Sequence, residues 1–445
     1  MKVDEERQKL LKIADIVLAA SKKQGATQAE LSASTSQGFS VSARLGQVET
    51  VEHQRDRGIG VTVYFGKRSG FASTNDTNEK SLHETVAAAC DIAQSTMIDE
   101  HGGLADPNRL AKEHPDLGLS YPWNIDVSAA IELAIACDNK ARFLDPKIKS
   151  SDGADVSAQE GVYLYANSHG FVGCYPASRY GLSCRLIAED NGNMERDSGF
   201  TIARDPSDLH SIEKVAEEAA TKVLARLQAR SLSTREAPVI FSADIASGLL
   251  SSFISAITGA RLYRKSSFLV DHLGKEIFPR HIDIYEEPHL KKGLGSAPYD
   301  AEGVSTQPKH FVKEGVLTSY VLSSYSARQL GLETTGNAGG VYNLRVSHGN
   351  DSLPELLKKM DTGLLVTDVM GQGINLVTGD YSRGASGFWV EQGQIQYPVH
   401  EITIAGNLKT LFQGIIAIGN DIDLRGNICC GSILIDRMMI AGLSA

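Results

Sequence analysis

The sequence has few of the features that mark a membrane-spanning or nucleic-acid-binding protein. Its 445 residues contain no apolar run long enough to cross a bilayer, and 54 acidic against 44 basic side chains give a net charge of −10. Sequence-independent DNA binding depends on lysine and arginine contacts to phosphates, so this deficit of positive charge argues against it. We expect no membrane span and no direct contact with nucleic acid.

Cysteine is also scarce. No CxxC pair occurs, and the six cysteines are scattered along the chain at Cys90, Cys137, Cys174, Cys184, Cys429 and Cys430. In a chain of 47.9 kDa this pattern indicates a reducing compartment rather than a disulfide framework. The first 23 residues mix acids with bases and break every apolar run, so we predict no signal peptide and a cytoplasmic location.

The common catalytic signatures are missing as well. There is no GxSxG nucleophile elbow, although a dispersed Ser/His/Asp triad stays open. Gly371-Gln372-Gly373 begins like a dinucleotide fingerprint, but Leu376 stands where the third glycine belongs. His83-Glu84 resembles half of a zinc-protease signature, but the second histidine that would complete it is missing. We therefore interpret this pair as two exposed polar residues on an amphipathic helix.

The apolar residues that are present alternate between helical and strand periods. Leu10, Ile13, Val17 and Ala20 recur at helical spacing within residues 5–23. Further helices are predicted at residues 78–97, 127–135, 208–229 and 243–258. Two strands are predicted within residues 58–73, on either side of a turn at 66–70, and further strands at residues 39–44, 162–165, 170–175, 180–190, 238–241, 316–322, 364–369, 387–390, 394–397, 401–404 and 432–435. The pattern predicts an α+β protein: a mixed helix and strand region, then a mainly antiparallel β domain containing a buried helix.

The chain is too long for one ordinary core. Residues 99–126 are rich in turn formers and lack a period, which is typical of a linker. We predict an N-terminal α+β domain at 1–118, a middle α+β domain at 119–235 and a C-terminal β-rich domain at 236–445.

Three blocks in the last third of the chain resemble the TldD/PmbA family. The first block is Asp300-Ala301-Glu302-Gly303-Val304-Ser305-Thr306, continued by Glu314 to Leu317, Tyr325 to Arg328 and Thr335 to Asn337; the second is Thr378 to Ser382 with Gly384 to Gly387; the third is Ala417 to Asp421 followed by Cys430-Gly431. A single block is a weak signal, whereas three in order at family-like spacing are specific.

The resemblance implies a two-subunit zinc protease that processes unfolded peptides. In this family a TldD-type subunit carries an HExxxH zinc motif and a cysteine ligand, and a PmbA-type (TldE-type) subunit lacks the motif. The pair trims a peptide-antibiotic precursor and degrades an antitoxin, and so modulates DNA gyrase indirectly. The resemblance therefore implies a homologous TldD-type partner, unfolded peptide substrates and, for the chain alone, a homodimer on the same surface.

The residues at the metal motif decide which subunit this chain resembles. Alignment with the motif places Ala243 at the first histidine, Asp244 at the glutamate and Gly248 at the second histidine. Cys430 matches the third ligand, and one thiolate does not make a catalytic zinc site. Ligands five residues apart also require a bulge in an α-helix. We predict a non-catalytic subunit with a vestigial metal site and no cofactor of its own, the zinc residing in the partner.

Five further residues in or next to the first two blocks are candidates for binding the substrate. Glu302, Gly303, Asp380, Tyr381 and Arg383 are candidates for a groove that holds an extended peptide by main-chain pairing. The alternative is that they fix tight turns. Two other functions also stay open: a self-sufficient peptidase with an unrecognised site, and a regulatory scaffold that binds gyrase directly.

Overall fold

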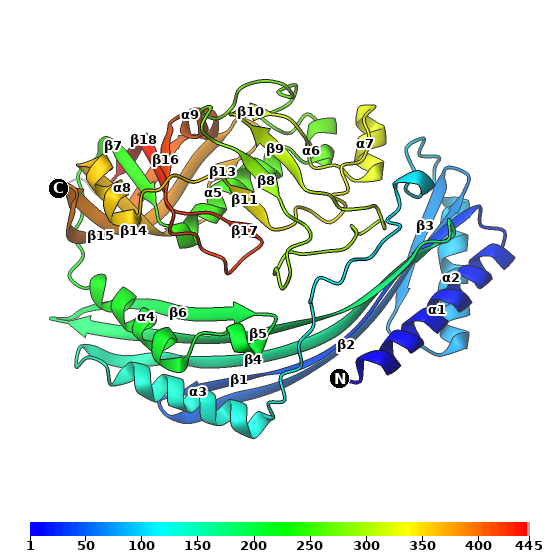
Figure 1. Ribbon diagram of the computed structural model, residues 1–445, viewed down its shortest axis with the longest axis horizontal. Coiled ribbons are helices and arrows are strands. Elements are labelled where there is room, and N and C mark those ends of the chain that lie inside the picture. Colours follow the sequence, from blue (N-terminus) through cyan, green and yellow to red (C-terminus); the bar gives the residue numbers. More distant parts are fainter. Residues whose placement is uncertain (443–445) are drawn as a thin grey trace.

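The computed structural model describes residues 1–442, and its largest feature is a long, strongly curved antiparallel sheet (Figure 1). The strands follow the order β3-β2-β1-β4-β5-β6. They are β1 (Gln28–Arg44), β2 (Gln47–Phe65), β3 (Arg68–Thr74), β4 (Ile148–Asn167), β5 (Val172–Asp190) and β6 (Asn193–Ala203). Residues on both sides of the 99–126 segment thus share one sheet.

Two helix pairs cover the convex face of this sheet. Helices α1 (Val3–Lys23) and α2 (Glu79–Ser95) pack at one end, and α3 (Val127–Arg142) and α4 (Ile212–Ala225) pack at the other (Figure 1). Strand β1 reaches both cores, because Leu31 is buried in the first and Val41 in the second. Side chains alternate along a strand, so the intervening serines of β1 face the concave side.

The C-terminal region lies over the concave face (Figure 1). One sheet has the order β12-β7-β18-β15-β14-β13 with β16 beside β18, and the other has the order β10-β9-β8-β11-β17. The strands are β7 (Arg235–Phe241), β8 (Ile284–Glu286), β9 (Lys309–Lys313), β10 (Val316–Leu317), β11 (Leu344–Val346), β12 (Gly363–Met370), β13 (Ile374–Asn375), β14 (Asp380–Glu391), β15 (Gln394–Asn407), β16 (Ile415–Ile418), β17 (Ile428–Cys429) and β18 (Ile433–Ala441). Pairing is antiparallel except between β7 and β12 and between β11 and β17.

Helix α5 (Ala243–Ala256) lies in the main C-terminal core, where Leu249 and Phe253 are buried. The other C-terminal helices are shorter: α6 (Gly259–Tyr263), α7 (Ser324–Leu330), α8 (Leu353–Met360) and α9 (Leu408–Gln413). No helix among residues 1–442 combines the length and the apolar character that a membrane crossing requires.

The segment 99–126 fastens the C-terminal region to the curved sheet. The N–H of Ala111 donates to the carbonyl of Gly303 at 2.9 Å, and the N–H of Ser305 donates to the carbonyl of Arg109 at 3.0 Å. Arg328 on α7 adds three side-chain hydrogen bonds to carbonyls of the same segment. The segment predicted as a linker is therefore docked along much of its length.

The mixed α+β class is confirmed, and several predicted elements need correction. Strands β1 and β4 are far longer than predicted, because each of them buries side chains in two separate cores. Residues 394–397 and 401–404 belong to one strand, β15, whereas only Val316–Leu317 of the predicted strand 316–322 forms as β10. Within residues 1–442 the C-terminal region has four helices besides α5, whereas the sequence predicted a β domain with one buried helix.

Candidate functional site

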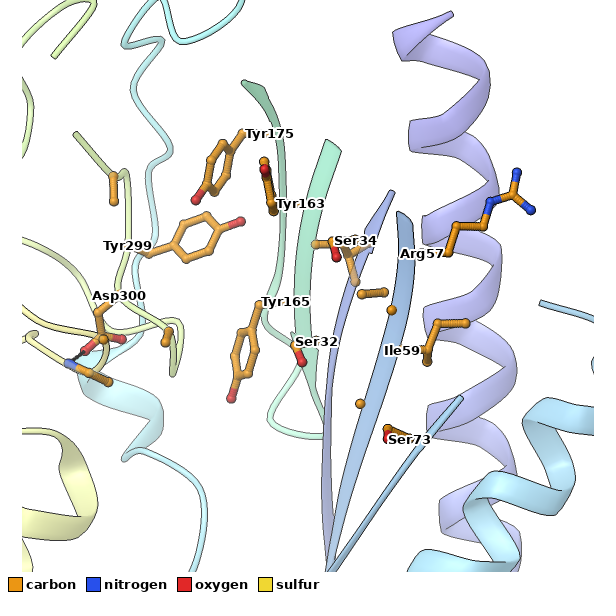
Figure 2. Close-up of a pocket in the computed structure, with 18 of the residues that line it drawn as sticks. Ser32, Ser34, Arg57, Ile59, Ser73, Tyr163, Tyr165, Tyr175, Tyr299 and Asp300 are labelled. Atoms are coloured by element: carbon orange, nitrogen blue, oxygen red, sulfur yellow. Dashed lines mark hydrogen bonds between the residues drawn. The ribbon is translucent and has the colours of Figure 1, made fainter. Parts of the chain in front are cut away.

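A large cavity lies between the concave face of the curved sheet and the C-terminal region. It has a volume of about 1000 Å³ and is lined on one side by β1, β2 and β4 and on the other by the loop around Tyr299 and Asp300 (Figure 2). A second hollow of about 520 Å³ shares Tyr163, Tyr175 and Tyr342 with it. Together they form a cleft that extends along the sheet.

Five tyrosines line this cleft, and we call four of them the tyrosine pocket: Tyr163, Tyr165, Tyr175 and Tyr299 (Figure 2). The ring centroids of Tyr163 and Tyr175 are 5.9 Å apart, and those of Tyr175 and Tyr299 are 5.7 Å apart. Tyr299 comes from the C-terminal region and lies against Gly173 of β5, where an added Cβ would stand 2.3 Å from the ring. Glycine at 173 therefore lets this ring reach the sheet.

Three carboxylates lie beside the tyrosine pocket. The Asp300 carboxylate is 2% exposed and accepts hydrogen bonds from the N–H groups of Glu302, Val304 and Ala338 at 2.9 to 3.0 Å. Burial and the charge of Glu302 raise its pKa to about 7, despite those hydrogen bonds. Burial also raises the pKa of Glu30, which accepts from the Tyr165 hydroxyl at 2.6 Å.

The raised pKa of Asp300 predicts a pH-dependent stability. The folded protein binds the proton more tightly than the unfolded chain, so this stabilisation is complete below about pH 4 and is lost as the pH rises toward 7. Between pH 4 and pH 7 the free energy of unfolding of the wild type is expected to decrease by up to about 4 kcal/mol relative to that of the Asp300→Asn variant, which has no proton to lose at this position. Denaturant titrations of both proteins between pH 4 and 7 measure the gap, and a gap that stays constant contradicts the prediction.

The five groove candidates lie in two different places. The Glu302 carboxylate accepts from the N–H of Ser324 at 2.8 Å, and Gly303 has φ +76° and lies so close to Phe171 that an added Cβ would stand 2.9 Å from the ring. This pair adjoins the wall of the cleft beside Asp300. The groove role of Glu302 and Gly303 stays a prediction with this location in its favour.

The other three candidates lie on β14, and none of them lines the cleft. The Asp380 carboxylate accepts from the hydroxyl of Thr378 at 2.6 Å and from Asn407 at 3.1 Å, which holds a turn together. Tyr381 is 3% exposed within the main core. Arg383 donates to the carbonyl of Val369. Their contacts are those of turn and packing residues.

The positions that match the zinc motif lie at the start of α5. Ala243 is the first residue of the helix, Gly248 is exposed with no atom within 4 Å of an added Cβ, and Cys430 is 1% exposed. Cys430 and the buried face of α5 belong to the same core. The helix is a regular α-helix without a π-bulge, so positions 243 and 248 point about 140° apart.

A chain of ion pairs begins at Asp244, the residue that stands at the position of the motif glutamate. Asp244 pairs with Lys222 at 3.2 Å, Lys222 with Glu218 at 2.9 Å, Glu218 with Arg425 at 2.9 Å, and Arg425 with Asp423 at 2.9 Å. Although burial raises it, the pKa of Glu218 is held below its ordinary value by the hydrogen bond and charge of Lys222. Asp244 therefore links α5 to α4 across the boundary with the curved sheet.

The residues present do not fit a zinc ion. Ala243 and Gly248 offer no donor atom, so Cys430 alone of the three positions could ligate a metal, and one thiolate does not make a zinc site. Within residues 1–442 no three His, Cys, Asp or Glu side chains are grouped to hold a metal. His83 is half exposed on α2 and lies 3.7 Å from Glu79, in agreement with a surface residue.

The sequence analysis named none of the four tyrosines of this pocket as site residues. Tyr163, Tyr165 and Tyr175 come from the hairpin of β4 and β5, and their signal was an alternating spacing of tyrosines around a predicted turn. Tyr299 immediately precedes the first family block. Tyr163 pairs with Tyr175 across the hairpin, and this pairing places the two rings on the same face of the sheet.

Comparison with known proteins identifies the family. The PmbA/TldA metallopeptidase models match this chain in three parts: domain 1 at residues 29–93, the central domain at 120–227 and the C-terminal domain at 234–442. The chain belongs to the PmbA/TldD metallopeptidase family, which confirms the resemblance found in the three sequence blocks.

Individual relatives agree with this membership. The chain is 48% identical to Metalloprotease PmbA of Escherichia coli O157:H7, over 96% of this chain and 94% of that protein. It is 47% identical to the PmbA homolog of Haemophilus influenzae, over 98% and 97%. A crystal structure from Bacteroides thetaiotaomicron, described as a candidate modulator of DNA gyrase, superposes with a TM-score of 0.92 at 28% identity and covers 97% of this chain and 98% of its own.

Proposed function

We propose that this chain is the metal-free, PmbA-type (TldE-type) subunit of a two-subunit peptidase. A homologous TldD-type subunit supplies the zinc and the catalytic residues, and this chain supplies the cleft between its curved sheet and its C-terminal region. The observation that carries the proposal is the motif itself: Ala243 and Gly248 stand where zinc ligands are required.

The substrates in this proposal are unfolded peptides. The cleft is open and large enough for an extended segment, and its sheet wall is lined by small polar residues such as Ser32 and Ser34. Such a wall suits many sequences, as expected of a protease that matures peptide-antibiotic precursors and degrades antitoxins. An effect on gyrase then follows indirectly, through the peptides that the pair removes.

One supporting observation concerns the cellular compartment in which this activity is proposed to take place. All six cysteines are free thiols in the part of the chain that the structure describes, in agreement with a cytoplasmic location.

Two alternative functions can be distinguished from this proposal by experiment. A self-sufficient peptidase requires a catalytic site in this chain alone, and a regulatory scaffold requires direct binding to gyrase. In the absence of its partner the chain is proposed to form a homodimer.

Metal analysis tests the proposal. The purified chain, incubated with zinc and then desalted, is expected to hold far less than one zinc per chain, because two of the three ligands have no donor atom. A TldD-type subunit carried through the same steps is the positive control. One tightly held zinc per chain, unaffected by Cys430→Ser, places a metal site elsewhere in the chain and overturns the proposal.

A further inference from the structure

One arginine of the cleft has no partner within the chain. Arg179 lies on β5, is exposed and lines the second hollow of the cleft. Within residues 1–442 its side chain forms no ion pair and no hydrogen bond. The five N–H groups of this guanidinium are therefore free to meet a ligand.

A second arginine on the same strand shows what Arg179 lacks. Arg185 follows it on β5 by six residues, so the two side chains point to the same face of the sheet. Arg185 pairs with the carboxylate of Asp155 at 2.7 Å. Opposite Arg179, strand β4 presents Gln159 instead, and the amide of this residue donates to the side chain of Gln54 at 3.0 Å. The cross-strand neighbour of Arg179 is thus neutral and is bonded elsewhere.

A buried positive charge lies beside Arg179. Arg204 donates to three carbonyl oxygens at 2.8 to 3.2 Å, those of Ser178, Gly293 and Leu294. Burial lowers the pKa of Arg204, and the positive charge of Arg179 adds to that lowering. The carbonyls satisfy three of its five N–H groups and leave its charge uncompensated. Two positive charges therefore share one wall of the cleft, in a chain whose net charge is −10.

The two carboxylates that line the same hollow do not neutralise this pair of arginines. Glu160 accepts from the terminal amine of Met1 at 2.7 Å and from the hydroxyl of Tyr180 at 3.2 Å. Asp56 lies on β2, and β1 and β4 separate that strand from β5, which corresponds to about 14 Å along the sheet. Water and salt screen charges over about 10 Å, so Asp56 has little effect on Arg179.

We propose that Arg179 forms a subsite for a carboxylate of the bound peptide: its guanidinium contacts the carboxylate, and the buried charge of Arg204 attracts it. The C-terminus and the side chains of Asp and Glu are the sources of this group in an unmodified peptide. This inference deepens the proposed function and rests on it. A two-pronged contact between arginine and carboxylate fixes one point of the peptide, while the small residues along the sheet leave the remaining sequence free.

Fluorescence anisotropy of four labelled peptides tests the subsite and identifies the source of the carboxylate. The probes are flexible Gly/Ser/Asn peptides of about twelve residues, labelled at the N-terminus with a neutral dye. Two of them end in a free carboxylate or in an amide, and two amidated ones carry a central Glu or Gln. The wild-type chain is expected to bind at least one carboxylate peptide about tenfold more tightly than its neutral counterpart.

Substitutions of Arg179 assign this preference to one side chain. Arg179→Gln is expected to abolish the preference, and Arg179→Glu is expected to reverse it, because the new carboxylate repels that of the peptide. Arg179→Lys keeps the charge without the planar fork, so we expect a preference of only about threefold. Arg185→Gln is the matched control and is expected to bind all four peptides like the wild type, because Arg185 is already paired and lies outside the cleft. Thermal unfolding checks that each variant is folded.

Equal binding of the carboxylate and neutral peptides, no measurable binding of any peptide, or a preference that survives Arg179→Gln overturns the subsite. Cleavage of the same peptides by the chain with a TldD-type subunit distinguishes this failure from failure of the proposed function. If that pair cuts all four peptides equally well, with and without Arg179→Gln, the subsite is wrong and the proposed function stands. If the pair cuts none of them, the proposed function is wrong.

Discussion

Replacing Arg328 by alanine is expected to lower the free energy of unfolding by about 3 kcal/mol or more, because three hydrogen bonds to a charged group are lost together. The guanidinium donates to the carbonyls of His101, Gly103 and Leu104 at 2.7, 2.6 and 3.1 Å. These bonds tie α7 to the segment that runs from α2 toward α3. Arg328→Ala leaves the carbonyls without a donor and releases the segment from the C-terminal region.

The measurement is denaturant unfolding together with limited proteolysis of residues 99–126. Arg280→Ala is the matched control. The Arg280 side chain is 84% exposed, and its ion pair with Glu276 is long, at 3.9 Å, so it contributes little to the free energy of unfolding. Arg328→Lys keeps the charge but lacks the planar fork that reaches three acceptors, so we expect an intermediate loss. If Arg328→Ala is as stable and as protease-resistant as Arg280→Ala, the segment does not fasten the two parts together.

Elements with a strong local period were predictable from the sequence. Helix α1 was predicted at residues 5–23 and forms at Val3–Lys23, because its apolar residues recur at helical spacing over five turns. Helix α8 was missed although Ser352, Pro354 and Glu355 form a readable start signal, a capping box with proline in the first turn. Its eight residues contain too few apolar positions to establish a period.

The length of the curved sheet was not predictable from local pattern. Residues 35–38 of β1 lie between the two helix-covered cores, so they include no buried apolar side chain and carry no alternating signal. They are strand because β2 and β4 pair with them on both sides. Such long-range pairing depends on neighbours more than 100 residues away, as between Gly38 and Gln159.

The candidate site was predictable only where it coincided with a motif. The loss of donor atoms at positions 243 and 248 followed directly from the alignment. The ion-pair chain that starts at Asp244 did not, because Lys222 and Arg425 come from distant parts of the chain. The same applies to the tyrosine pocket, whose members are joined by the close packing of Tyr299 against Gly173.

Peptidase activity is expected to appear only when this chain meets a zinc-bearing homologue. In the proposed assembly, this chain contributes the cleft, and a subunit with the HExxxH motif contributes the metal that activates water. Because enzymes accelerate such reactions by at least about a millionfold, the mixture is expected to exceed the chain alone by on the order of a thousandfold or more in cleavage rate.

The most direct measurement is cleavage of an unfolded peptide by four preparations: this chain alone, the chain with an intact TldD-type subunit, the chain with a TldD-type subunit whose motif histidines are alanines, and Cys430→Ser of this chain with the intact subunit. We expect activity in the second and fourth preparations only. Cleavage by the chain alone, or loss of activity in the Cys430→Ser pair while the two subunits still associate, would show that this chain supplies catalytic metal chemistry and would contradict its assignment as the metal-free subunit.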